Sequence, residues 1–192
     1  MKLYGLTGGV GMGKSTASEI LRARGCPVID TDFLARQIVA PGEPALQEIR
    51  STFGPTVVSE TGELNRGELA RIIFSDATAR QKLEAILHPR IRDLWKKQVD
   101  RWRGEGRASA CVVIPLLFET NAEKEFAATI CVACSLETQR KRLRDRGWTD
   151  EQMGQRIAAQ WPIEKKMTRS DYVVWTEGDL DSVAAQLERI LA

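Results

Sequence analysis

The stretch that decides the fold is Gly8-Gly9-Val10-Gly11-Met12-Gly13-Lys14-Ser15. It fits the pattern G-x-x-x-x-G-K-[S/T] of the phosphate-binding P-loop. The flanking sequence fits the same motif, because residues 2–7 have the pattern of a strand and residues 16–24 that of a helix, which Gly25 is placed to end. The spacing therefore predicts a strand, a glycine-rich turn and a helix that together bind a nucleotide.

The chemistry of phosphate binding explains these residue types. Glycines let phosphate oxygens approach the backbone closely, and successive N–H groups at a helix N-terminus bind an anion. Lys14 is predicted to reach the β- and γ-phosphates, and the hydroxyl of Ser15 to bind Mg²⁺. A glycine turn that merely connects a strand to a helix is disfavoured by the complete motif. The predicted ATP-binding residues are Gly8, Gly9, Gly11, Met12, Gly13, Lys14, Ser15 and Thr16.

Length and composition limit the class of protein. The 192 residues suffice for one compact domain with an inserted subdomain, and 43% hydrophobic and 28% charged residues are ordinary for a soluble globular protein. The net charge of +2 is too small to indicate a nucleic-acid or membrane partner. No apolar run approaches membrane-spanning length, and the N-terminus lacks the apolar region of a signal peptide. We expect a cytoplasmic protein that is a monomer, with a small homo-oligomer as the alternative.

The four cysteines do not have the pattern of a disulfide framework. Cys131 and Cys134 form a lone C-x-x-C, but residues three apart in a strand point to opposite faces. No second pair completes a zinc site, so we expect these cysteines in the core.

Strands and helices alternate along the chain, which predicts an α/β fold with a parallel sheet and right-handed crossovers. The predicted strands are residues 2–7, 26–29, 110–114, 128–133 and 172–175. Their apolar runs are mostly continuous, as in strands covered by helices on both faces. The last helix has the clearest apolar stripe, made of Leu180, Val183, Ala184, Leu187, Ile190 and Leu191. We therefore expect three layers, with a five-stranded parallel sheet between helices.

The segment between the second and third predicted strands is too long for one crossover. It contains helical patterns at residues 33–39, 45–53, 66–74, 79–87 and 89–103. We interpret residues 31–104 as a helical insertion, and residues 1–30 with 105–192 as the nucleotide-binding core. Open α/β sheets bind ligands at the carboxyl ends of their strands, so the insertion is expected beside the P-loop.

Asp30-Thr31-Asp32 directly follows the second predicted strand. In extended chain, residues two apart face the same way, so both carboxylates are expected to face one cleft. The hydroxyl that accepts a phosphoryl group needs a carboxylate to take its proton. The residues alone leave two functions equally open: a base or Mg²⁺ ligand, and a cap for the next helix.

Three other segments have both a functional and a structural interpretation. Pro115–Glu119 is either the lip of an apolar pocket closed by one carboxylate or an apolar loop with a solvent-facing glutamate. Arg142 and Arg146, four apart in a basic run, are either part of a solvated face or lid arginines that stabilise a transferring phosphoryl group. A capping box at Thr149 starts the next helix. His88, which precedes a proline, indicates a helix terminus when taken alone.

The chain resembles the dephospho-CoA kinase family nearly from end to end. Many families share the P-loop, but the order of the segments that follow it is much more specific. These are Asp30-Thr31-Asp32 with Ala35-Arg36, Leu87-His88-Pro89 with Arg92, Pro115-Leu116-Leu117-Phe118-Glu119, and Gln139, Arg142, Arg146, Arg156, Gln160, Lys166 and Asp171. The resemblance implies a P-loop NTPase fold with a helical CoA-binding insertion and a lid at residues 140–165.

The resemblance also implies a reaction and roles for individual residues. ATP would donate its γ-phosphoryl group to the ribose 3′-hydroxyl of dephospho-CoA, the final step of CoA biosynthesis, with Mg²⁺ and no tightly bound organic cofactor. Asp32 would be the general base or orient the hydroxyl, and is an alternative Mg²⁺ ligand that acts through a water. Lys14, Arg142 and Arg146 would neutralise the phosphates. The implied acceptor-binding residues are Asp32, His88, Arg92, Leu116, Leu117, Phe118 and Glu119.

Two positions depart from the family pattern. Val113 stands where the family commonly has an acidic residue, which leaves more of the magnesium chemistry to Asp32. Thr176 stands where an asparagine is frequent, which leaves open an adenine contact from that side chain. The main alternative function is another small-molecule kinase, for a nucleoside or nucleotide. A GTPase switch is disfavoured because the sequence has no N-K-x-D segment, and a nucleic-acid ATPase because the charge is balanced.

Overall fold

The computed structural model describes the backbone of residues 1–192 and every side chain except that of Phe74, which lies outside the described residues. The chain divides into two compact units, residues 1–30 with 101–192 and residues 31–100. The sequence placed the second boundary at residue 104. It falls a few residues earlier because helix α5 (Ala77–Gly104) belongs to both units.

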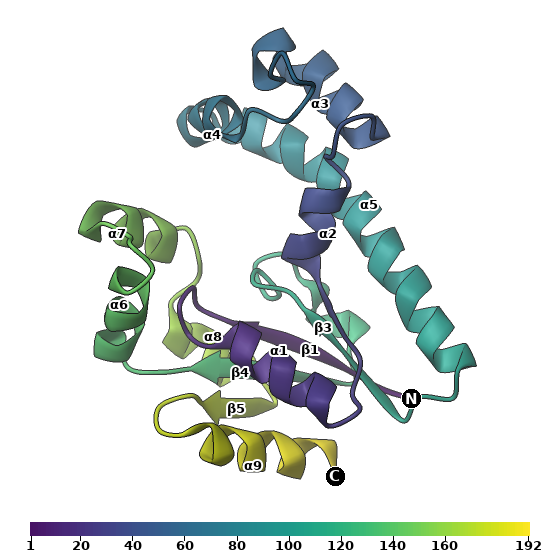
Figure 1. Ribbon diagram of the computed structural model, residues 1–192, viewed down its shortest axis with the longest axis vertical. Helices are drawn as coiled ribbons and strands as arrows, with labels where there is room; N and C mark the ends of the chain where they lie inside the picture. Colours follow the sequence, from purple (N-terminus) through teal and green to yellow (C-terminus); the bar gives the residue numbers. More distant parts are fainter. The chain divides into compact units, whose positions relative to one another are not determined.

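The first unit is built on a parallel sheet. In the described backbone this sheet has five strands, in the order β2-β3-β1-β4-β5 (Figure 1). The strands are β1 (Lys2–Gly8), β2 (Val28–Asp30), β3 (Ser109–Val113), β4 (Ala128–Ala133) and β5 (Tyr172–Trp175). In the central strand, Leu6 pairs with Val113 of β3 on one side and Ile130 of β4 on the other. The predicted strands and their parallel arrangement are confirmed.

Helices cover both faces of this sheet. Helices α1 (Lys14–Ala23) and α9 (Leu180–Leu191) pack on the face that carries Tyr4 and Leu6, and the hydroxyl of Tyr4 donates to the carbonyl oxygen of Ile190 at 2.8 Å. Helix α8 (Ile163–Arg169) packs on β1 and β4 from the other side, the side of Cys131, whose neighbours Ile130 and Val132 belong to the first face. The expected three layers are therefore present.

The predicted stripe of the last helix is mostly confirmed. Val183, Leu187 and Ile190 are buried in the core beneath α9. Leu180 is 65% exposed, because it is the first residue of the helix and lies beyond the edge of the sheet's apolar surface. All four cysteines are buried and unpaired, so the expectation that the C-x-x-C belongs to the core is confirmed.

Two helices and a tight turn lie between β4 and α8. Helix α6 (Leu136–Arg144) starts at Ser135, whose side chain accepts from the N–H of Thr138. Helix α7 (Asp150–Ala158) starts at the capping box formed by Thr149 and Gln152, as predicted. A short 3-10 helix, η2 (Ala122–Glu125), precedes β4. Helices α6 and α7 thus form a helical pair that overlaps the predicted lid at residues 140–165, which also includes the start of α8.

The second unit is helical and has its own core. It contains α2 (Thr31–Gln37), α3 (Pro44–Phe53), the 3-10 helix η1 (Pro55–Val57), α4 (Arg66–Ser75) and most of α5. Its core residues are Ile38, Val39, Ala45, Ile49, Val57, Leu69, Leu83 and Ile86. Asn65 begins α4 by accepting the N–H of Glu68 through its side chain.

Helix α5 corrects one prediction, because it is continuous where the sequence predicted a break at His88-Pro89. A proline inside a helix removes one N–H donor and crowds the preceding turn. The guanidinium of Arg90 donates to the carbonyl oxygen of Ile86 at 2.6 Å and pairs with Glu48 of α3 at 2.6 Å, which supplies a donor beside the proline. His88 is therefore an exposed residue inside a helix and not a helix terminus.

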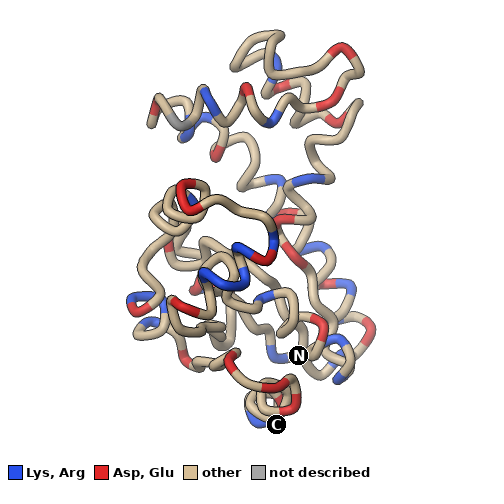
Figure 2. Tube along the Cα trace, turned by 60° about the vertical axis from the view of Figure 1, so that its left-hand side comes forward, with Lys and Arg blue, Asp and Glu red and all other residues tan. Residues whose placement is uncertain are grey.

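Basic and acidic residues are interspersed along the whole trace (Figure 2). This distribution agrees with the net charge of +2. Among the described residues, we find no helix with the length and apolar character needed to cross a bilayer.

Candidate active site

The P-loop joins β1 to α1 through a turn that depends on its glycines. The N–H of Met12 donates to the carbonyl oxygen of Gly9 at 3.2 Å and closes the turn. Gly8, Gly11 and Gly13 have φ of 148°, 77° and 94°, a region that L-residues with a side chain rarely adopt. These three conformations turn the chain from the end of the sheet into the first turn of α1.

Gly8 has a second reason to be glycine, which gives a testable prediction. A Cβ atom at Gly8 would lie 2.4 Å from the carbonyl oxygen of Val132 in β4. Gly25 also has a positive φ, of 78°, but a Cβ atom added there would meet nothing within 4 Å. We therefore expect Gly8→Ala to lower the free energy of unfolding by more than about 3 kcal/mol, and Gly25→Ala by about 1 kcal/mol. Urea titration of both variants measures this, and equal losses would contradict the close approach.

The start of α1 is suited to an anion. The first turn contains no acidic residue, and no described side chain caps it. The N–H groups of that turn and the positive end of the helix dipole are therefore directed to the turn's outer side, where a phosphate binds. The ammonium of Lys14 curls over the loop and donates to the carbonyl oxygens of Gly8 at 2.8 Å and Gly9 at 2.9 Å. Ser15 is exposed on the same first turn.

The side chain of Thr176 contacts the backbone of the P-loop. Its hydroxyl lies 3.0 Å from the carbonyl oxygen of Met12 and 3.2 Å from that of Ala133, and donates to one of them. It also accepts from Arg142 at 3.0 Å, and a second Arg142 nitrogen donates to the carbonyl oxygen of Thr176 at 2.6 Å. A Cβ at Gly13 would be 3.1 Å from this side chain. The hydroxyl that replaces the family's asparagine is thus engaged with the P-loop backbone.

Arg142 and Arg146 meet the P-loop at one cavity of about 330 Å³. A spacing of four residues would put both arginines on one face of a helix, but α6 ends at Arg144 and Arg146 lies in the turn that follows. That turn nevertheless brings both arginines to the wall that also contains Gly13 and Thr16. The structure therefore brings two predicted lid arginines together with the predicted nucleotide-binding residues.

The residue after Thr176 is held by the start of α6. The carboxylate of Glu177 accepts from the hydroxyl of Ser135, from the N–H of Ser135 at 3.0 Å and from the indole N–H of Trp175 at 3.0 Å. These hydrogen bonds, chiefly that of the Ser135 side chain, lower the pKa of Glu177 to about 2. The ionised carboxylate fixes the chain that carries Thr176 to the beginning of the lid helices.

The segment Pro115–Glu119 does not have the solvent-facing glutamate of its structural interpretation. Leu117 and Phe118 are 0% and 1% exposed, so they face the interior, and Phe118 stacks on Trp161 with ring centroids 6.5 Å apart. Glu119 is not solvent-facing: one carboxylate oxygen accepts from the ammonium of Lys166 at 2.8 Å and from the N–H of Trp161 at 2.9 Å. Pro115, Leu116 and Glu119 are the three residues of the segment that keep some exposed surface.

Lys166 contacts the segment Pro115–Glu119, and the sequence alone did not predict this contact. It is fully buried, and its ammonium also donates to the carbonyl oxygen of Pro115 at 2.6 Å. The hydroxyl of Thr7, next to the P-loop, donates to the same carbonyl oxygen at 3.1 Å. The second carboxylate oxygen of Glu119 is buried and has no hydrogen-bond partner among the described residues. Nothing in the local pattern of α8 distinguishes Lys166 from its exposed neighbour Lys165.

This ion pair gives a second prediction. Lys166→Met leaves a carboxylate in a site that is only 15% exposed, so we expect the free energy of unfolding to fall by about 3 to 5 kcal/mol. The double variant Glu119→Gln/Lys166→Met removes the uncompensated charge and is expected to recover part of that loss. Lys141→Met, in a pair that is 76% and 61% exposed, is the matched control and should change stability by less than about 1 kcal/mol. Strictly additive losses in the double variant would show that the two charges do not interact.

Three of the predicted acceptor-binding residues, Asp32, His88 and Arg92, lie in the second unit. Helix α2 begins at Thr31, so Asp30 ends a strand and Asp32 is in the first turn of a helix. The prediction that residues 30–32 are extended, with both carboxylates facing the same way, is therefore wrong. Asp32 is exposed. His88 and Arg92 are also exposed, and because they are four residues apart within α5 they share one face of it.

The described residues fit a magnesium ion that arrives with a nucleotide. They contain no group of three or more His, Cys, Asp or Glu side chains placed to hold a metal by themselves. Val113 is 1% exposed and packs in the core. Mg²⁺ in kinases is commonly held by one or two protein oxygens together with substrate phosphates, and the exposed hydroxyl of Ser15 beside the P-loop is such a donor.

Comparison with known proteins identifies the family of this chain. A family model described as dephospho-CoA kinase matches residues 2–182. The chain belongs to the dephospho-CoA kinase family. A dephospho-CoA kinase from Bdellovibrio bacteriovorus is 38% identical over 100% of this chain and 95% of the relative, and one from Anaeromyxobacter dehalogenans is 42% identical over 100% and 92%. Membership identifies the chain as a kinase that uses ATP, which agrees with the P-loop.

Solved structures agree with the family. A crystal structure of a Thermus thermophilus protein superposes with a TM-score of 0.87, at 35% identity over 99% of this chain and 96% of the other. A dephospho-CoA kinase from Campylobacter jejuni superposes with a TM-score of 0.71, at 26% identity over 100% and 96%. A shikimate kinase from Acinetobacter baumannii, with a TM-score of 0.55 and 15% identity, shares the fold. The fold of the dephospho-CoA kinase family is thus the P-loop kinase fold that the sequence predicted.

Proposed function

We propose that this chain transfers the γ-phosphoryl group of ATP to the ribose 3′-hydroxyl of dephospho-CoA and forms CoA and ADP. The bond between the γ-phosphorus and the β,γ-bridging oxygen breaks, and a bond between that phosphorus and the 3′-oxygen forms. The observation that carries the proposal is the complete P-loop between β1 and α1, with Lys14 over it, in a chain of the dephospho-CoA kinase family.

The P-loop unit is proposed to bind and neutralise the triphosphate. The N–H groups of the first turn of α1 and the ammonium of Lys14 stabilise the charge that moves onto the leaving ADP. Arg142 and Arg146 add positive charge from the lid side, because they line the cavity that Gly13 and Thr16 also line. A bound Mg²⁺ would supply further neutralisation of the phosphate oxygens, and the hydroxyl of Ser15 would hold it.

The acceptor is proposed to use the helical unit. Asp32 is the candidate base: it is exposed, and it follows β2 so closely that its Cα lies within about 8 Å of that of Asp30 by chain geometry alone. It takes the proton of the 3′-hydroxyl or orients this group for attack. His88 and Arg92, exposed on one face of α5, offer hydrogen-bond donors to phosphate groups of the acceptor. In the first unit, Leu116, Leu117, Phe118 and Glu119 remain the acceptor-binding residues that the family resemblance implies, and Leu116 and Glu119 keep some exposed surface.

We also propose that the enzyme works in the cytoplasm. The support is that its four cysteines are all unpaired, as is usual where thiols are kept reduced.

The test is a coupled assay of ADP release in the presence of Mg²⁺, with four acceptors offered in turn. Dephospho-CoA is expected to support turnover, and adenosine, AMP and pantetheine to give only the background rate of ATP hydrolysis. Turnover with adenosine or AMP and none with dephospho-CoA would instead support the alternative, a nucleoside or nucleotide kinase on the same core.

A further inference from the structure

Val10, a P-loop residue that the motif leaves unspecified, is held by two glutamines. The side-chain amide of Gln139 donates to the carbonyl oxygen of Val10 at 2.7 Å. The N–H of Val10 donates to the side-chain oxygen of Gln160 at 3.0 Å. Both hydrogen-bonding groups of one P-loop residue are therefore fixed by side chains that lie far away in the sequence.

The two glutamines flank residues 140–159, which make up most of the predicted lid at residues 140–165. Gln139 is in α6 and is 3% exposed, whereas Gln160 follows α7 and is partly exposed. The chain between them contains the end of α6, the turn and the whole of α7. The chain is therefore hydrogen-bonded to Val10 both before this stretch, through Gln139, and after it, through Gln160.

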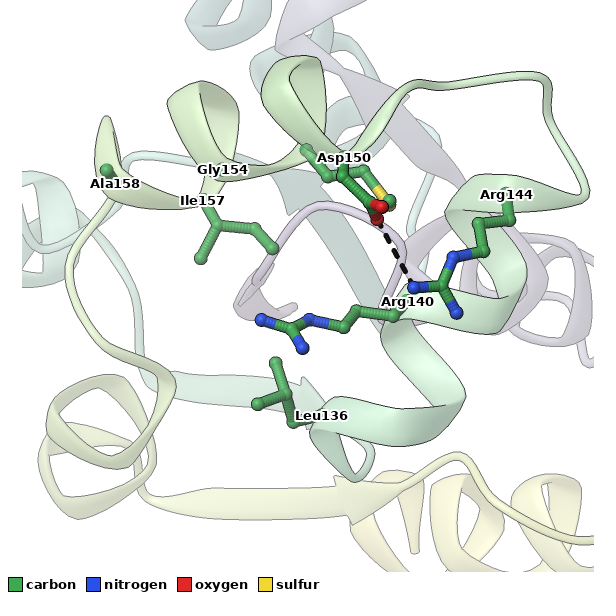
Figure 3. Close-up of a pocket in the computed structure, with 8 residues that line it drawn as sticks. Leu136, Arg140, Arg144, Asp150, Gly154, Ile157 and Ala158 are labelled. Atoms are coloured by element: carbon green, nitrogen blue, oxygen red, sulfur yellow. Dashed lines mark hydrogen bonds and ion pairs between the residues drawn. The ribbon is translucent and has the colours of Figure 1, made fainter.

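Farther from the two glutamines, α6 and α7 line a cavity and are linked by an exposed ion pair. A cavity of about 360 Å³ lies between α6 and α7. Figure 3 shows Arg144 of α6 pairing with Asp150 of α7, while Arg140 extends between Leu136 and Ile157. The Arg144–Asp150 pair, 3.2 Å long, is exposed at both ends and therefore adds little stability. The hydrogen bonds from this part of the chain to Val10 are those of the two glutamines.

Trp161, the residue after Gln160, also binds the core. The N–H of Trp161 donates to Glu119 at 2.9 Å, and Glu119 is held by the buried Lys166. The backbone that carries Gln160 is thus anchored to the core, which limits where its side chain can point. The side-chain oxygen of Gln160 is in this way aimed at the N–H of Val10.

The neighbours of Val10 explain why such support is needed. Val10 stands between Gly9 and Gly11, and glycines give the backbone unusual freedom. The amides of a phosphate-binding loop contribute most when they are oriented before the ligand arrives. Gln139 also fills the space beside the loop, because a Cβ at Gly11 would lie 3.4 Å from its side chain.

We propose that Gln139 and Gln160 are positioning residues that orient the P-loop through Val10 and couple it to the lid. Gln139 holds the carbonyl oxygen of Val10, and Gln160 holds its N–H. This inference rests on the proposed kinase function. Its physical core, the hydrogen bond from Val10 to Gln160, can be measured without any substrate.

The test compares Gln160→Met, which keeps the size and loses the acceptor oxygen, with Gln155→Met as a matched control. Gln155 is exposed on α7 and contacts Glu151 of the same helix. Hydrogen exchange of the Val10 N–H, followed by NMR on the free protein, is expected to accelerate about 3- to 10-fold in Gln160→Met, the equivalent of one hydrogen bond. Exchange in Gln155→Met should match the starting protein.

Kinetics provide the second readout. Gln160→Met is expected to lower kcat for phosphoryl transfer about 3- to 10-fold at an unchanged melting temperature, and Gln155→Met to change neither. Gln160→Glu keeps an oxygen that accepts from Val10, so it should restore slow exchange of this N–H in the free protein. Gln139→Met tests the other side of the peptide and is expected to show a non-additive effect when combined with Gln160→Met.

Two results would overturn the proposal. One is unchanged Val10 exchange in Gln160→Met; the other is a loss of activity in this variant that simply follows a loss of thermal stability. Failure of the starting protein to phosphorylate dephospho-CoA would refute the proposed function instead, and the exchange result would still stand by itself. If Gln139→Met does not fold, Gln160→Met and its control decide the question, because Gln160 is only partly buried.

Discussion

Lys14→Met is expected to lower kcat by about 10² to 10³, with little change in thermal unfolding. The ammonium of Lys14 lies 2.8 Å and 2.9 Å from two carbonyl oxygens of the P-loop, so it is held where a triphosphate binds. Methionine keeps the apolar stem and removes the charge. The two carbonyl groups belong to a partly exposed site and can bind water instead. The loss therefore falls on phosphoryl transfer and not on folding.

The matched control is Lys141→Met. Lys141 is 76% exposed and pairs with Asp145 at 2.9 Å on α6. Steady-state kinetics with ATP and dephospho-CoA, together with melting curves, should show an effect for Lys14 alone. A lost unfolding transition in Lys14→Met would mean that the residue is structural, and equal activity losses in the two variants would remove Lys14 from the mechanism.

Asp32→Asn is expected to reduce kcat by about 10² to 10⁴ and to leave the Kd for ATP nearly unchanged. Asparagine has the size of aspartate but cannot accept a proton from the 3′-hydroxyl. The helix should persist, because Asp32 is an exposed residue in the first turn of α2. Single-turnover kinetics measures the chemical step, and titration calorimetry measures nucleotide binding.

Two other aspartates make this test specific. Asp181 is the second residue of α9 and is exposed, as Asp32 is in α2, so Asp181→Asn controls for the loss of an acidic residue near a helix N-terminus. Asp30 is the competing carboxylate at the end of β2. A large loss in Asp30→Asn with full turnover in Asp32→Asn would transfer the role of base to Asp30.

The sheet and the P-loop could be predicted because their signals are local. Five apolar runs and one glycine pattern each lie within a few consecutive residues, and alternation of strands with helices then fixes a parallel sheet. The P-loop conformation follows from Gly8, Gly11 and Gly13, which occupy the positions where φ is positive. Local chemistry of this kind is visible in a sequence without knowledge of distant contacts.

The errors arose where tertiary contacts override a local rule. A proline usually ends a helix, but α5 continues through Pro89, and next to the proline the side chain of Arg90 bonds Ile86 of α5 and Glu48 of α3. The aspartates at 30 and 32 seemed to share a face, because helix α2 was expected to begin two residues later than it does. Helix boundaries of this kind depend on the packing of the whole unit.

The polar contacts of the site were invisible for a different reason. Lys166 reaches Pro115 across 51 residues, and Gln160 reaches Val10 across 150. Such pairs have no periodicity and no fixed spacing, so only the fold reveals them. The family resemblance named Gln139, Gln160 and Lys166 as matching positions, and the structure supplies their contacts.

The most direct test of the proposed activity is to identify the product. The purified protein is incubated with ATP, Mg²⁺ and dephospho-CoA, and the product is examined by phosphorus NMR. We predict one new phosphomonoester resonance, coupled to the ribose proton at the 3′ position, in an amount equal to the ADP formed. ADP without this resonance, or a phosphate attached to any other oxygen, would contradict the proposal that the P-loop delivers its phosphoryl group to dephospho-CoA.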